Sequence, residues 1–121
     1  MLDVGGARAT FGTKRGNDEK RGLVILITGD VVARPETFDE LRAISLEHVR
    51  RSRLEPGCIS HAVHIDAENA LRLVFVEQWA DQAAVTAHFA VPESGAFVRA
   101  ASKLAAGPPA IQVYDATLVA R

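Results

Sequence analysis

The stretch LRLVFVEQW, residues 71–79, carries the pattern on which the fold prediction rests. Its bulky and β-branched side chains favour a pleated, largely buried strand over an exposed one. Because side chains alternate along a strand, Phe75, Glu77 and Trp79 share one face. That face is apolar except for a single acid, and Trp79 is the chain's only tryptophan.

Working outward from this strand, residues 58–65 and the turn at residues 66–69 complete a β-hairpin. Near the start of the chain, residues 23–32 have the sequence LVILITGDVV. This run is too continuously apolar for a strand with one solvent-exposed face, so both of its faces must be covered. Gly29 within it indicates a bulge or the close approach of another backbone. Residues 111–119 predict a last strand.

Helices fill the remaining gaps. They are predicted from Pro35 to Arg53, after an Asp81 N-cap through Phe89, and from Pro92 to near Gly107. The order strand, helix, strand, strand, helix pair, strand is the split βαβ pattern of an α+β, ferredoxin-like sandwich, with a four-stranded antiparallel sheet and helices on one face. Because the strands are apolar on both faces, the helix-free face predicts a homodimer.

Composition narrows the class of protein. With 121 residues, 48% of them hydrophobic, the chain suits one domain, which we place at residues 22–121 after a flexible tail at residues 1–21. A net charge of −1 disfavours nucleic-acid and membrane-surface partners. Cys58 is the only cysteine, which fits a reducing compartment, and no apolar run reaches the roughly 20 residues of a membrane span. We therefore expect a cytoplasmic protein.

Three short motifs resemble a known family. They are Glu55-Pro56-Gly57-Cys58 before the second strand, Glu77-Gln78-Trp79 closing the third, and Ala87-His88-Phe89 in the helix that follows. Together they are similar to the antibiotic biosynthesis monooxygenases, quinol-monooxygenase-like dimeric α+β barrels. The resemblance spans about residues 22–118 and implies a dimer with a cavity between sheet and helices in each subunit. Relatives include oxygenases that act on quinols or polycyclic phenols without metal or flavin, haem-degrading enzymes, and members with no known activity.

The resemblance implies a monooxygenase that needs no cofactor and oxidises a phenolic, quinol or anthrone-like ring with O₂. In that hypothesis His88 is the base, Trp79 is an aromatic wall whose N–H reaches an oxygen, and Glu77 is a further polar group. The predicted substrate-binding residues are His48, Phe75, Phe89 and Phe97. Glu77 also has a purely structural interpretation, an ion pair with Arg72, Arg42 or Arg99.

Other functions stay open at this point. A haem-degrading relative would have an asparagine in the first strand, where this chain offers only Thr28 and Asp30. A non-catalytic dimer that binds a small aromatic ligand or acts in stress physiology, and a cofactor-free isomerase or decarboxylase, need the same pocket. No metal site is expected, because His61 and His64 are three apart on a strand and point to opposite faces.

The register of the hairpin leaves one further alternative. In one pairing Cys58 and Ser60 join the face of Glu77, and a shift by one residue brings Ile59 and His61 there instead.

Overall fold

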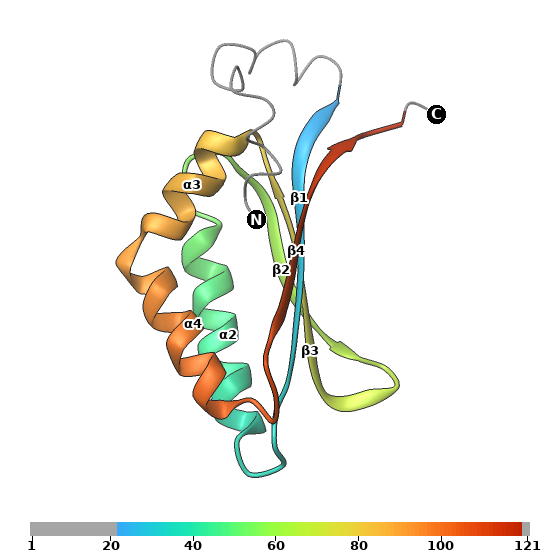
Figure 1. Ribbon diagram of the computed structural model, residues 1–121, viewed down its shortest axis with the longest axis vertical. Helices are drawn as coiled ribbons and strands as arrows, with labels where there is room; N and C mark the ends of the chain where they lie inside the picture. Colours follow the sequence, from blue (N-terminus) through green and yellow to red (C-terminus); the bar gives the residue numbers. More distant parts are fainter. Residues whose placement is uncertain (1–21, 120–121) are drawn as a thin grey trace.

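The computed structural model describes residues 22–119, so the predicted tail at residues 1–21 lies outside the described residues. The elements follow the predicted order (Figure 1): β1 Leu23–Val32, α2 Phe38–Ser52, β2 Cys58–Asp66, β3 Asn69–Trp79, α3 Gln82–Ala90, α4 Pro92–Leu104 and β4 Ala110–Thr117. Within this part of the chain, no helix combines the length and the apolar character needed to cross a membrane.

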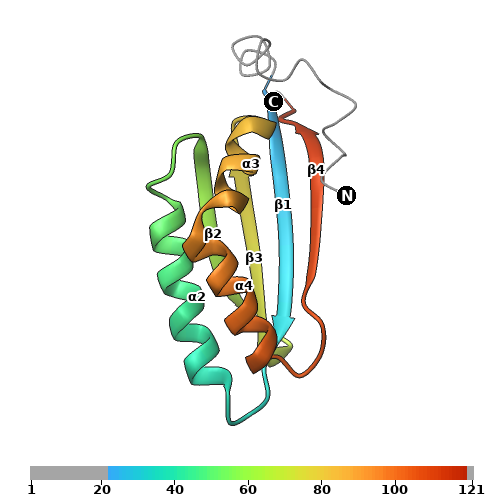
Figure 2. The same cartoon turned by 60° about the vertical axis from the view of Figure 1, so that its left-hand side comes forward.

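The four strands form one antiparallel sheet in the order β2-β3-β1-β4. All three helices cover the same face of the sheet, which Figures 1 and 2 show from two directions. The prediction of an α+β, ferredoxin-like sandwich is therefore confirmed.

Local signals set the helix boundaries with small differences from the prediction. α2 begins at Phe38 rather than Pro35, because residues 35–37 form a turn before the helix. The predicted N-cap of α3 is confirmed, since the Asp81 carboxylate accepts a hydrogen bond from the backbone N–H of Ala84 at 2.9 Å. α4 begins at Pro92 as expected.

The apolar interior between sheet and helices has two parts. The Leu41 cluster consists of Val31, Ala33, Leu41, Val49, Leu73, Phe75, Ala101 and Ala105. The Ile25 cluster consists of Ile25, Ile27, Trp79, Val85 and Val113. The second cluster lies under α3 and the first under α2 and α4, so the three helices are held to the sheet by separate apolar contacts.

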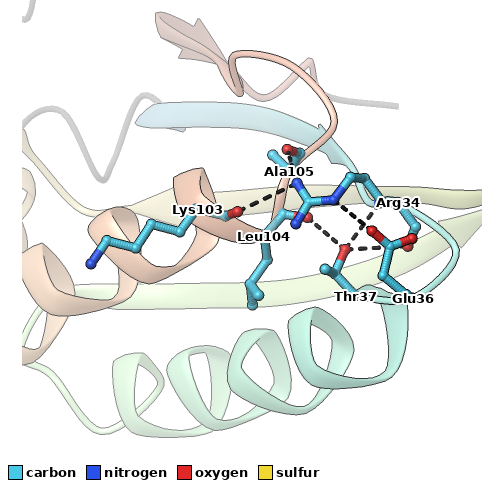
Figure 3. Close-up of polar contacts among 6 residues, drawn as sticks. All are labelled: Arg34, Glu36, Thr37, Lys103, Leu104 and Ala105. Atoms are coloured by element: carbon cyan, nitrogen blue, oxygen red, sulfur yellow. Dashed lines mark hydrogen bonds and ion pairs between the residues drawn. The ribbon is translucent and has the colours of Figure 1, made fainter.

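The end of α4 is fixed to the connection between β1 and α2 (Figure 3). The Arg34 guanidinium donates to the carbonyl of Ala105 at 2.9 Å, and the Thr37 hydroxyl donates to the carbonyl of Leu104 at 2.6 Å. The Glu36 carboxylate forms an ion pair with the same guanidinium, with 2.9 Å between Arg34 Nε and Glu36 Oε2. These contacts satisfy carbonyl groups that have no partner inside the helix, and they set the position of α4 against the sheet.

The other face of the sheet carries no helix. The register places apolar side chains on it from every strand: Val24, Leu26, Ala62, Val74, Val76, Tyr114 and Ala116. None of them is buried in the single chain, whereas Ile25 and Ile27, which alternate with them on β1, are.

Candidate functional site

A β-bulge in β2 decides which side chains face the helices. Cys58 is opposite Trp79, Ser60 is opposite Gln78, and the register shifts between them. The extra residue, Ile59, is 53% exposed. Each of the two predicted registers is therefore correct for part of the strand. Cys58, from the first register, and His61, from the second, both lie on the face of Glu77.

Three histidines from three elements meet under the helices. His48 lies on α2, His61 on β2 and His88 on α3, and they are only 6%, 2% and 2% exposed. Their ring centroids are 5.3 to 5.7 Å apart. One ring nitrogen from each lies within 4.8 Å of the others. We call these three residues the histidine cluster.

A carboxylate orients His88. Glu55 Oε1 lies 2.8 Å from His88 Nδ1, so the imidazole donates Nδ1–H to the carboxylate and keeps a lone pair on Nε2. Glu55 belongs to the loop between α2 and β2, far from His88 in sequence. This pairing supplies what a general base needs, a partner that fixes its tautomer and stabilises its protonated form.

Gly57 allows the loop that carries Glu55 to lie against α3. Its φ angle is +84°, a conformation that favours glycine, and a Cβ there would overlap the Cβ of Ala84. The carbonyl of Gly57 accepts a hydrogen bond from the N–H of Ala80 at 2.8 Å. The motif Glu55-Pro56-Gly57 thus has a physical role, since it brings a carboxylate to the helix of His88.

His48 is held neutral. Its Nδ1 accepts a hydrogen bond from the Arg51 guanidinium at 2.9 Å, and its ring stacks on Phe97 with 4.2 Å between centroids and 8° between planes. Burial, followed by the charges of His61, His88 and Arg51, lowers the pKa of His48 to about 3. A neutral imidazole whose Nδ1 is an acceptor carries its proton on Nε2, so His48 is a hydrogen-bond donor.

Glu77 is paired, but with none of the arginines that the sequence suggested. Its carboxylate accepts from Trp79 Nε1 at 2.8 Å and lies 3.3 Å from His61 Nε2. Burial alone raises the pKa of Glu77, but His61, the Trp79 N–H and the charge of His88 outweigh burial and lower it. Arg72 instead binds Asp30 at 2.6 Å and Asp66 at 2.9 Å.

A pocket of about 320 Å³ lies between the sheet and helices α3 and α4. Six predicted site residues line it: His48, Phe75, Glu77, His88, Phe89 and Phe97. Gly29 contributes to the space, because a Cβ there would lie 3.2 Å from the carbonyl of Ala110 and would narrow the pocket. The close backbone approach that its position in β1 suggested is therefore present.

Trp79 differs from the prediction. It is fully buried, it is not among the pocket-lining residues, and its N–H already binds Glu77. Its ring lies 4.5 Å from that of His88, centroid to centroid. The indole therefore supports Glu77 and His88 from behind rather than forming a wall that a ligand can touch.

Sequence reasoning missed four polar groups at this site, namely Glu55, Arg51, His61 and Ser94. Ser94 lines the pocket with a buried hydroxyl that has no hydrogen-bond partner among residues 22–119. Glu55 was part of the recognised motif, but spacing alone did not connect it with His88. Cys58 packs against the Ile25 cluster, and burial raises the pKa of its thiol.

Comparison with known proteins shows where this architecture occurs. The family profile for antibiotic biosynthesis monooxygenase matches residues 25–100. An uncharacterized protein of Synechocystis, sll1783, is 33% identical over 90 residues, which cover 74% of this chain. The matched part is 61% of that relative's length.

Two solved structures share the fold. A crystal structure of an antibiotic biosynthesis monooxygenase has a TM-score of 0.72 at 23% identity, covering 78% of this chain and 99% of that one. Rv0793 of Mycobacterium tuberculosis has a TM-score of 0.74 at 24% identity, covering 80% of this chain and 97% of that one. With its sheet, its helices and the matched residues 25–100, the chain belongs to the antibiotic biosynthesis monooxygenase family.

Proposed function

We propose that this protein is a cofactor-independent monooxygenase that oxidises a phenolic, quinol or anthrone-like ring with O₂. The observation that carries the proposal is the Glu55–His88 pair at the wall of an apolar pocket. A volume of about 320 Å³ is at the lower end of the range for small-molecule sites, which suits a small ring system.

The first step is removal of a proton from the substrate. His88 Nε2 has the free lone pair, and Glu55 stabilises the imidazolium that forms. The neutral His48 then donates its Nε2–H to the oxygen of the resulting anion. One imidazole acts as acceptor and the other as donor because Glu55 binds the first ring and Arg51 the second.

The anion then passes an electron to O₂, and the two radicals combine. One oxygen atom stays on the ring carbon as a carbonyl, and the other leaves as water with two hydrogens of the substrate. The substrate supplies all the electrons that reduce O₂, so the reaction needs no external reductant. Phe75, Phe89 and Phe97 keep water from the anion, which strengthens its interactions with the two histidines.

Oxygen uptake tests this function. Chelator-treated, haem-free protein is offered a panel of hydroquinones and anthrones, and the rate is compared with the uncatalysed rate. His88→Ala should lower the rate by roughly 10²- to 10⁴-fold, and Glu55→Gln should lower it less. Glu68→Gln, at an exposed acid in the turn between β2 and β3, is the matched control for Glu55→Gln and should leave the rate unchanged.

Each contrary result has a clear meaning. Ring binding without uptake above the background would favour the ligand-binding dimer, and turnover of a ring without oxygen would favour an isomerase or decarboxylase. Uptake that survives His88→Ala in a folded protein would remove His88 from the mechanism.

We also propose that two copies pair through the helix-free sheet face. Val76 lies in the middle of this face, opposite Thr28 on one side and Ala62 on the other. A carboxylate at this position would be buried in the proposed interface, where desolvation of a charge is costly. Val76→Glu should therefore yield monomers in sedimentation velocity, and a wild-type protein that sediments as a monomer would exclude the interface.

A further inference from the structure

His61 is the least satisfied group of the site. Its side chain has no exposed surface, and neither ring nitrogen has a hydrogen-bond partner within residues 22–119. The 3.3 Å approach to Glu77 is close enough for an ion pair but lacks the alignment of a hydrogen bond. A buried imidazole whose one polar contact, with Glu77, lacks hydrogen-bond geometry is costly, and native proteins seldom keep such a group without a reason. The proposed oxidation does not use His61.

We propose that His48, His61 and His88 form a binding site for a divalent transition-metal cation of the Zn²⁺ or Co²⁺ class. Imidazole nitrogens are common ligands of these cations, and three of them with one open position make a typical reactive site. The open coordination position faces the pocket, because His48 and His88 line that pocket. A water molecule or the oxygen of a pocket ligand would fill it.

The distances suit such an ion. In a tetrahedral site with bonds of 2.0–2.1 Å, neighbouring nitrogens are roughly 3.3 Å apart. The three nitrogens already lie within 4.8 Å of one another. Metal binding would therefore require the rings to move closer together, and each ring comes from a separate element.

The surrounding charges also favour a cation. Glu55 holds His88 through Nδ1 and leaves Nε2 for the metal, the usual arrangement of a carboxylate behind a metal-binding histidine. Glu77 adds a second carboxylate beside His61. Arg51 opposes them with one positive charge and a hydrogen bond to His48 Nδ1, so coordination by His48 must displace either that bond or the Nε2 proton.

This site goes beyond the proposed oxidation and does not depend on it. A cation on His88 Nε2 occupies the lone pair that would accept the substrate proton, so the metal-bound protein should oxidise rings more slowly. Binding can be measured without substrate or O₂. A failure of the oxygenase proposal therefore leaves the metal proposal standing, and the reverse also holds.

The test uses the full chain without a polyhistidine tag, stripped with chelator and titrated with Co²⁺. Binding should give the intense visible d–d absorption of four-coordinate cobalt, saturating at one ion per chain, and Zn²⁺ should displace it. His61→Ala should weaken binding at least about 100-fold. His64→Ala, on the same strand but exposed, should leave binding unchanged, and Arg51→Met should strengthen it.

Circular dichroism of each variant separates lost binding from lost folding. Removal of His61 takes away its 3.3 Å contact with Glu77, but the Glu55–His88 and Arg51–His48 hydrogen bonds do not involve it and should stay in place. Wild-type protein provides a second measurement that needs no variant, since diamagnetic Zn²⁺ should shift the imidazole NMR signals of three histidines and spare that of His64. A wild-type protein with no cobalt absorption, or a folded His61→Ala variant that binds as tightly as wild type, would overturn the proposal.

Discussion

The Leu41 cluster and the histidine cluster both lie between the sheet and the helices, yet they are built in different ways. The Leu41 cluster has eight buried apolar side chains, whose contacts are not directional and whose contributions add up with buried area. The histidine cluster depends on single pairs, such as Glu55 with His88 and Arg51 with His48, each with a required orientation. We therefore expect stability to depend mainly on the first cluster and the proposed chemistry to depend on the second.

The most direct test of this difference is to make a cavity in the Leu41 cluster. Leu41 is 0% exposed, so Leu41→Ala should lower the free energy of unfolding by about 2–5 kcal/mol in urea denaturation. Leu41 does not line the pocket, and the rate per folded molecule should be unchanged. Leu54→Ala, at an 86% exposed leucine, is the control and should change stability by less than about 0.5 kcal/mol.

A second substitution acts on the boundary between the loop and α3. Gly57→Ala should cost roughly 2–4 kcal/mol of unfolding free energy, because it adds both backbone strain and an overlap with Ala84. The displaced α3 should also separate Glu55 from His88, so activity should fall along with stability. This joint loss is what distinguishes the position from Leu41.

Two further variants check that explanation. Gly107→Ala meets no atom within 4 Å and should be tolerated. The double variant Gly57→Ala with Ala84→Gly removes the overlapping Cβ and should recover part of the stability. Because Ala84→Gly inside α3 itself costs about 1 kcal/mol, the single variant Ala84→Gly is measured too, and purely additive effects of the two changes would show that backbone strain alone is responsible.

The smallest expected effect is a dependence of stability on pH that comes from His48. Its pKa is about 3 in the folded protein and near 6.5 when unfolded, so the unfolded chain binds the extra proton between these values. Stability should therefore fall as pH drops, by about 2 kcal/mol between pH 7 and pH 5. The depressed pKa of Glu77 acts in the same direction at lower pH.

Urea denaturation of metal-free protein at several pH values measures this effect. His48→Gln keeps an acceptor for Arg51 but cannot titrate, so its stability should vary less between pH 7 and pH 5. His64→Ala should keep the wild-type slope. An equal slope in His48→Gln and wild type would assign the pH dependence to other groups.

The fold could be predicted from the sequence because its signals are local and repeated. Continuous apolar residues indicate β3 and β1. A capping aspartate marks the start of α3, and a proline marks the start of α4. The first turn of α2 was placed three residues early, because Pro35 suits a turn before a helix as well as the helix itself. Such differences move a boundary and leave the topology intact.

The site was harder to predict because it depends on pairs that are distant in sequence. The pocket residues His48, Phe75 and Phe97 lie on faces that periodicity identifies. Glu55 and His88 are 33 residues apart, and only the packing of the loop on α3 connects them. Trp79 was assigned to the pocket by its face alone, although Glu77, two residues before it, takes its N–H.

The bulge at Ile59 also separates the position of the loop before β2 from the register of β2 itself. With it, the loop is placed by α3 and the strand is placed by β3. Deleting Ile59 would draw the loop about 3.3 Å along the sheet and pull Glu55 from His88, while His61 stayed opposite Glu77. Like Gly57→Ala, this deletion should separate His88 from its carboxylate, but it should do so without adding an overlap with Ala84.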